Sequence, residues 1–200
     1  MEKKEMSTKK SKPNGDKFSE ESIQRALNLE YLSNPKFLVH NLYVFGWESD
    51  YLAKTVAGYW YEVEIKISLA DFKADFKKTD KHNALRNRGW CGREAIPNYF
   101  SYCVPKPLMD RVRHLVPDYA GLIGVNEYGH LIIEKAPPKL HPIKIADSDL
   151  NLADKFYYNW KEEKRKNREH DEIVRALRWQ ISFLREEYKA ATGYSINETL

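Results

Sequence analysis

Two carboxylates and a lysine in the first half of the chain have the types and spacing of a catalytic group. Asp50 precedes Glu64, and Lys66 follows two residues after Glu64. If residues 48–55 and 59–68 form a hairpin, residues whose numbers sum to 114 lie opposite each other, and Asp50 then faces Glu64. Directly opposite Cβ atoms lie ~4.5–5.5 Å apart. Because side chains alternate along a strand, Lys66 emerges on the same face as Glu64.

Such an arrangement is suited to phosphodiester hydrolysis. Like charges that face each other in a sheet repel unless a cation lies between them. Two carboxylates can share Mg²⁺ or Mn²⁺, which polarises a phosphate and activates water, while an ammonium stabilises or orients the nucleophile. An alternative interpretation is a surface strand on which Glu62, Glu64 and Lys66 form a solvated face.

The neighbourhood of these residues resembles the PD-(D/E)xK nuclease superfamily, with a helix, an Asp on one strand, Glu-x-Lys on the next strand and a following helix. More narrowly, the motif resembles the MmcB-type DNA repair proteins through Glu64 to Ser68, then Asp71-Phe72, Asp75 and Lys77. Weaker matches follow at Tyr102 to Pro105, Val116-Pro117 with Ala120 to Ile123, and Glu134 to Pro137. The resemblance covers about residues 37–138.

This resemblance implies a restriction-endonuclease-like α/β fold, a mixed sheet flanked by helices. It implies that Asp50 and Glu64 hold Mg²⁺ or Mn²⁺, that the backbone carbonyl of Ile65 completes the metal shell, and that Lys66 is the catalytic lysine. The superfamily usually supplies a further acid from an upstream element. Here the acids that could substitute are Glu20, Glu30 and Glu48.

The leading hypothesis is a metal-dependent DNA endonuclease or repair nuclease. A basic stretch after the motif would hold the phosphate backbone, through Lys73, Lys77, Lys78, Lys81, His82, Arg86 and Arg88. For His82, a surface position is the alternative to a phosphate contact. A second hypothesis, a non-catalytic DNA-binding or assembly module on the same fold, is motivated by the missing upstream acid and by the long helical C-terminus.

Composition excludes several classes of protein. With 42% hydrophobic residues in 200 positions, the chain has enough apolar material for a core, so disorder throughout is excluded. No apolar run approaches the ~18 residues of a membrane span, and the start lacks a secretory signal. The two cysteines lack zinc-site spacing and fit a reducing, cytoplasmic setting. A net charge of +4 permits nucleic-acid binding without demanding it.

The chain divides into three predicted parts. Residues 1–17 read as a disordered basic tail, residues 18–145 as the nuclease-like domain and residues 146–200 as a helical extension. Within the domain we expect a helix capped by Ser19 and a second helix capped by Ser68. Five further segments are expected, namely strands from Phe37, over 48–55, over 59–68 and over Tyr99–Val104, and a hairpin at 119–136. Residues 79–98 read as a loop-rich basic stretch, and Leu108–Leu115 as a short helix.

The C-terminal part is predicted to be helical. His170, Val174, Leu177, Ile181, Leu184 and Tyr188 follow the alternating spacing of four and three residues that coiled coils use. Either a homodimer through this helix or packing on the chain's own domain would cover these side chains.

Other residues have two interpretations each. Asp71 and Asp75, one helical turn apart, could hold a metal ion, but read better as a helix cap and a partner for nearby lysines. Tyr51, Trp60 and Trp90 could stack on bases or belong to the core.

Overall fold

The computed structural model describes residues 18–88 and 95–192. The expected basic tail at 1–17 lies outside the described residues, as do Trp90 and Cys91. The described chain forms two compact units that divide after Leu152. None of the helices in the described ranges is long and apolar enough to cross a membrane.

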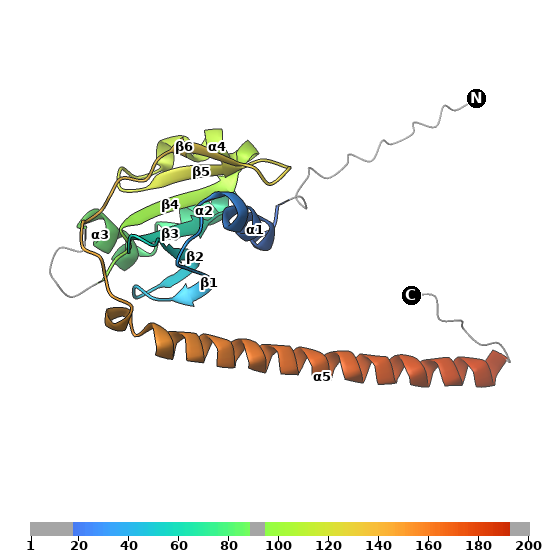
Figure 1. Cartoon of the computed structure of the whole chain (residues 1–200). Helices are drawn as coiled ribbons and strands as arrows, with labels where there is room; N and C mark the ends of the chain where they lie inside the picture. The colour runs from blue at the N-terminus through green and yellow to red at the C-terminus, as the bar shows by residue number, and fades with distance from the viewer. Residues whose placement is uncertain (1–17, 89–94, 193–200) are drawn as a thin grey trace, which may run out of the picture. The chain divides into compact units, whose positions relative to one another are not determined.

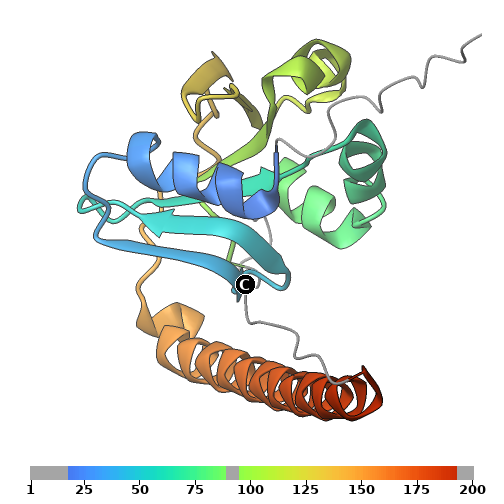
Figure 2. The same cartoon turned by 90° about the vertical axis from the view of Figure 1, so that its right-hand side faces the viewer.

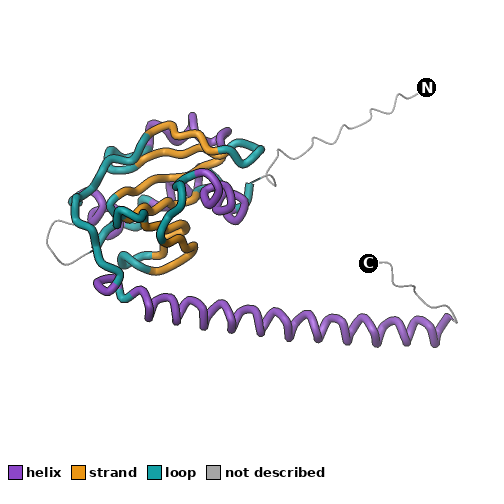
Figure 3. The backbone as a smooth tube through the Cα atoms, viewed as in Figure 1, coloured by secondary structure: helices purple, strands orange, loops and turns teal. Residues whose placement is uncertain are grey.

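The first unit is built on one mixed sheet (Figures 1 and 3). Its six strands lie in chain order: β1 (Phe37–Tyr43), β2 (Glu48–Lys54), β3 (Trp60–Ile65), β4 (Tyr99–Pro105), β5 (Gly121–Val125) and β6 (Leu131–Lys135). The strands β3, β4 and β5 are parallel, and the outer pairs are antiparallel. The expected mixed sheet flanked by helices is confirmed.

Helices cover both faces of the sheet (Figure 2). One face packs on α1 (Glu20–Glu30) through Ile23, Ala26 and Leu27. The other face packs on α2 (Leu69–Asp75), α3 (Thr79–Arg86) and α4 (Lys106–Val112), which is followed by a 3₁₀ turn at Arg113–Leu115. Because both faces are covered, β3 is buried on both sides. The interpretation of Glu62, Glu64 and Lys66 as a solvated face is therefore wrong.

Capping residues begin two helices where the sequence predicts them. The Ser19 hydroxyl accepts a hydrogen bond from the N–H of Ser22, whose own hydroxyl accepts one from the N–H of Ser19. Ser68 accepts from the N–H of Asp71 at 3.1 Å and begins α2 directly after β3. The residues that follow the Glu-x-Lys strand therefore turn back over its polar face.

One expectation about this region is corrected. Residues 79–98 were expected to form a loop-rich stretch, but Thr79–Arg86 is the helix α3. The helix lacks a long apolar stripe, and two of its four buried side chains are ionisable, Lys81 and His82. Without apolar periodicity the sequence does not distinguish such a helix from a basic loop.

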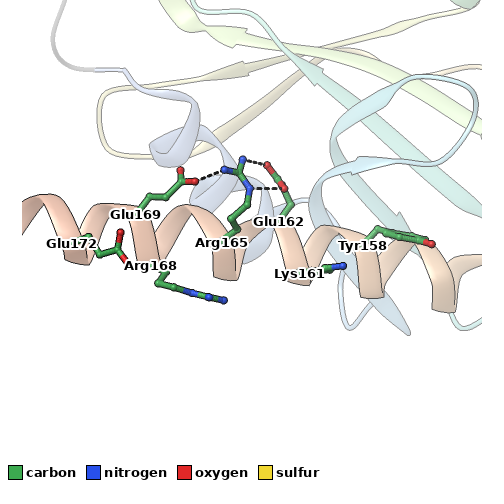
Figure 4. Close-up of a pocket in the computed structure, with 7 residues that line it drawn as sticks. All are labelled: Tyr158, Lys161, Glu162, Arg165, Arg168, Glu169 and Glu172. Atoms are coloured by element: carbon green, nitrogen blue, oxygen red, sulfur yellow. Dashed lines mark hydrogen bonds and ion pairs between the residues drawn. The ribbon is translucent and has the colours of Figure 1, made fainter.

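The second unit contains the helix α5 (Leu152–Thr192), which follows a 3₁₀ turn at Ser148–Leu150. The predicted long C-terminal helix is thus confirmed. Its first half carries pairs of opposite charge one turn apart. Arg165 lies between Glu162 and Glu169 and pairs with both (Figure 4). Such pairs support a helix in water, and the hollow that their side chains line on this one helix is a charged, solvated surface.

Candidate active site

The strands β2 and β3 bring the first two candidate residues together. Tyr51 pairs with Val63 and Lys54 with Trp60, so paired residues sum to 114 as the sequence predicts. One further step in that register sets Asp50 opposite Glu64. The Asp50 carboxylate also accepts a hydrogen bond from the N–H of Ile65 at 2.8 Å, which holds it beside the backbone of β3.

Three lysines surround the carboxylate of Glu64, which is buried. Its Oε1 accepts from the ammonium groups of Lys66 at 2.8 Å and Lys78 at 2.9 Å, and its Oε2 accepts from Lys81. Burial by itself would raise the pKa of Glu64, but the charges of Lys81 and Lys66 outweigh it and leave the pKa below its usual value. Glu64 is therefore ionised and central to a network of buried charges.

Asp50 behaves differently from Glu64. It is half-buried, and no ion pair links it to a cation among the residues that the structure describes. Burial and the nearby negative charge of Glu64 raise the pKa of Asp50 to about 6. Its hydrogen bond from Ile65 and the charge of Lys66 oppose this rise without cancelling it. Of the two carboxylates, Asp50 is thus the one whose ionised form the protein stabilises less.

Glu62 and Lys81 form a second layer behind Glu64. The Lys81 ammonium bonds Glu64 and lies 3.5 Å from Glu62 Oε1, which also accepts from Trp47 Nε1 at 2.7 Å. The same ammonium lies 4.9 Å from the ring centroid of Phe100. Burial raises the pKa of Glu62 to about 7, against the lowering effect of Lys81. The other oxygen of Glu62, Oε2, is buried without a hydrogen-bond partner.

Asp75 belongs to the same network. The sequence favoured Asp75 as a partner of nearby lysines, and its fully buried side chain does pair with them. Its Oδ1 lies 3.0 Å from Lys78 Nζ and 3.8 Å from Lys66 Nζ, and its Oδ2 accepts from the Tyr102 hydroxyl at 2.8 Å. Burial alone would raise the pKa of Asp75, but its bond with His82 and the charges of Lys81 and Lys66 hold the pKa well below its usual range.

Among the three upstream acids, Glu20 is coupled to the site. Gln24 on α1 is buried and donates through Nε2 to the backbone carbonyl of Asp50 at 3.0 Å and to Glu20 Oε1 at 3.1 Å. The charge of Glu20 contributes to the raised pKa of Asp50. Sequence reasoning did not single out Gln24, because an amide in an amphipathic helix carries no distinguishing signal.

The other two upstream acids lie elsewhere. Glu30 accepts from the N–H of Leu131 at 2.8 Å and pairs with His130, at the β6 side of the sheet. Glu48 begins β2 opposite Tyr43 and is exposed, with no contact to Asp50 or Glu64 recorded in the described part of the chain. The structure therefore brings Glu20, rather than Glu30 or Glu48, toward Asp50.

The predicted phosphate-binding residues separate into two groups. Exposed side chains belong to Lys73, Lys77, Lys78, Arg86 and Arg88. Lys81 and His82 are buried, which corrects their assignment as phosphate contacts. His82 Nδ1 lies 2.6 Å from the Tyr119 hydroxyl, and its Nε2 lies 3.0 Å from the carbonyl oxygen of Asp75. Lys81 ties α3 to β3, and His82 ties it to α2 and to Tyr119, so neither faces solvent.

Two aromatic residues with open interpretations belong to the core. Tyr51 and Trp60 are fully buried. Trp60 packs edge-on against Phe37 and Phe45, so neither residue is available to stack on a base.

Within the described ranges, no group of three or more His, Cys, Asp or Glu side chains converges as a ready-made metal site. Asp50 and Glu64 come from adjacent strands, and lysines bond both carboxylate oxygens of Glu64.

Comparisons with known proteins add little to this picture. No protein-family model and no curated protein matches the sequence. Among solved structures, one similar chain is SPO1766, a protein of unknown function from Silicibacter pomeroyi. It is 19% identical with a TM-score of 0.47, and the match covers 74% of this chain and 86% of that one.

Proposed function

We propose that this chain is a metal-dependent nuclease that hydrolyses DNA phosphodiester bonds, as an endonuclease or a repair nuclease. The observation that carries the proposal is Asp50 held on the N–H of Ile65 at 2.8 Å, next along β3 from Glu64, with the Lys66 ammonium 2.8 Å from Glu64. Ionisable groups with shifted pKa values gather at functional sites more often than elsewhere. DNA is the proposed substrate. We propose the cytoplasm as the location of the protein, since the free, buried thiol of Cys103 agrees with a reducing compartment.

The donor atoms fit a hard divalent cation at Asp50. Carboxylate and carbonyl oxygens are the ligands that Mg²⁺ and Mn²⁺ prefer, and Asp50, Glu64 and the Ile65 carbonyl supply them. Burial and the negative charge of Glu64 raise the pKa of Asp50 to about 6, and a cation bound at Asp50 would offset both effects. Lys78 already bonds Glu64 Oε1, but its side chain is half-exposed and can turn toward solvent. We therefore expect Lys78 and a metal ion to compete for Glu64.

When bound, the ion would polarise the phosphodiester and lower the pKa of a water molecule. The protein's own contribution is positional. Asp50 is fixed by the N–H of Ile65 and, through its backbone, by Gln24. The Lys66 ammonium is held by Glu64 and is buried, so it is pre-organised to orient a water molecule and stabilise negative charge that develops on the phosphate.

The exposed cations of α2, α3 and their ends would hold the DNA backbone. Lys73, Lys77, Arg86 and Arg88 are exposed and follow the catalytic strand in sequence. Each phosphate contact releases counterions, so the affinity for DNA should fall steeply as salt rises.

The test is cleavage of supercoiled, linear, single-stranded and branched DNA in Mg²⁺, Mn²⁺ or EDTA. Lys66→Met keeps the volume of the side chain and removes its charge. We expect it to abolish metal-dependent cleavage while DNA binding persists. Lys106→Ala removes an exposed lysine at the start of α4 and serves as the matched control. Full activity in Lys66→Met would refute the proposed role of this residue.

A second candidate is a DNA-binding or assembly module without catalysis. It is favoured by the three ammonium groups on Glu64 and by the lack of a converging three-ligand group in the described ranges. This candidate predicts salt-sensitive DNA binding with no metal requirement. Calorimetry with Mn²⁺ separates the two, because binding that is lost in Asp50→Asn supports the nuclease and no binding to either protein supports the module.

A further inference from the structure

The C-terminal half of α5 exposes a row of large apolar side chains. Ile173, Leu177, Ile181 and Leu184 are between 51% and 61% exposed. Exposed apolar side chains are ordinary when single, but a contiguous row of them marks an interaction surface. The nature of the partner can be argued from the spacing and the residue types along this row.

The spacing fits a coiled-coil seam. Val174 and Ile181 occupy the a positions of two successive heptads, and Leu177 and Leu184 occupy the d positions. β-Branched residues at a with leucine at d favour two parallel strands over higher assemblies. The preceding a position is Asn167, and a single buried Asn at a specifies register and a two-stranded state.

The flanking charges agree with a parallel pair. In a parallel, in-register dimer, each g position meets the following e position of the second copy. Lys166 then faces Asp171, and Gln180 faces Arg185. Along this stretch of the helix, no g position faces an e position of like charge. An antiparallel pair that keeps the same seam would instead bring Arg178 beside Arg178 of the second copy.

We propose that α5 forms a parallel, in-register two-stranded coiled coil with a second copy of this chain, with its seam at Asn167, His170, Val174, Leu177, Ile181 and Leu184. The dimer covers the apolar row and gives each assembly two copies of the candidate site. Two other apolar residues, Trp179 and Phe183, stack on each other with ring centroids 6.1 Å apart and lie outside the seam.

The first test is sedimentation equilibrium of the full chain and of two variants. Leu177→Glu places a charge in the seam. Phe183→Glu makes the same change at a residue of similar exposure outside the seam, 53% against 52%. We expect a dimer that dissociates at least ~100-fold more readily in Leu177→Glu and is unchanged in Phe183→Glu. A monomeric full chain at about 100 μM, or equal loss in both variants, overturns the proposal.

The second test fixes the orientation. Leu177→Cys and Leu184→Cys are made separately in a Cys91→Ser background and oxidised mildly; the other native cysteine, Cys103, is buried. In a parallel, in-register pair each new cysteine meets its own counterpart, so both variants form disulfide-linked dimers. Antiparallel pairing aligns residue 177 with residue 181, so failure of either variant to crosslink overturns the parallel arrangement.

Discussion

The two units depart from the usual distribution of side chains in opposite ways. The first unit buries charges at Glu62, Glu64, Lys66, Asp75 and Lys81, which globular proteins normally keep in water. The helix α5 exposes Leu177 and Ile181, together with other large apolar side chains that proteins normally bury.

This contrast shows where each unit depends on partners. A buried charge costs several kcal/mol unless opposite charges and hydrogen bonds surround it, and the first unit supplies them internally. An exposed apolar row gains nothing until another surface covers it, and the coiled coil proposed above gives α5 such a surface. The following predictions test this contrast, from the largest expected effect to the smallest.

Removing the charge of Glu64 should cause the largest loss in the free energy of unfolding. Glu64→Gln leaves the buried ammonium groups of Lys66 and Lys81 without their shared partner, and breaking a buried pair costs about 3–5 kcal/mol. Denaturant unfolding measures the loss. The matched change on α5 is Glu169→Gln, which removes an exposed pair with Arg165 and should leave the midpoint of the first unit unchanged. Equal effects of the two substitutions would contradict the contrast.

The second prediction concerns pH. The pKa of Glu62 is raised from 4.5 to about 7 in the folded state, so the folded state binds the proton more tightly than the unfolded chain. The contribution of Glu62 to the free energy of unfolding is complete at pH values below the pKa of Glu62 in the unfolded chain. This contribution is lost as pH rises through about 7. Between about pH 5 and pH 8, Glu62→Gln should therefore gain roughly 2–3 kcal/mol relative to the wild type.

Urea unfolding across this pH range measures the effect of Glu62→Gln. Glu127→Gln, at an exposed site between β5 and β6, is its control. A wild-type stability that rises relative to Glu62→Gln above pH 7 would mean that Glu62 is stabilised as a carboxylate.

The third prediction concerns a substitution that strengthens the proposed association of two α5 helices. Asn167→Val places an apolar side chain at an a position of the proposed coiled coil. We expect the dimer to tighten about tenfold or more, with some loss of preference for the two-stranded state. Sedimentation equilibrium measures both changes. Arg168→Ala, at the next residue and outside the seam, should leave the association unchanged.

The fourth prediction concerns competition at Glu64. Lys78→Ala removes a half-exposed cation from Glu64 Oε1 and should raise Mn²⁺ affinity several-fold, because a charge-assisted hydrogen bond no longer has to break. Lys77→Ala removes a neighbouring exposed lysine that makes no recorded bond to Glu64. Calorimetry compares the two. Unchanged or weaker Mn²⁺ binding in Lys78→Ala would show that Lys78 does not compete for Glu64.

The smallest effect is expected at Arg165. Arg165→Ala removes the pairs with Glu162 and Glu169 on the surface of α5. We expect a slight loss of helicity by circular dichroism at low salt that disappears at high salt, because exposed pairs are screened. A change in the unfolding midpoint of the first unit would contradict the separation of the two units.

The sequence by itself determined those features that depend on local pattern. A hairpin between residues 48–55 and 59–68 was assumed with paired residues summing to 114, and the pairing of β2 with β3 confirms that register. Ser19 and Ser68 predicted where α1 and α2 begin, because their hydroxyls cap the adjacent backbone. Large apolar residues repeat at helical intervals from Val174 to Leu184, and this spacing predicted the long helix.

Only the tertiary structure decided what covers the polar face of β3. Lys81 reaches Glu64 across 17 residues, and Gln24 reaches Asp50 across 26, so neither contact follows from a local pattern. In sequence, Lys81 and His82 have the composition of a solvated basic stretch; in the fold, Glu62, Glu64 and Asp75 supply the charges that make their burial possible. The reason is physical, since a charged side chain is buried only where distant parts of the chain bring its counter-charges together.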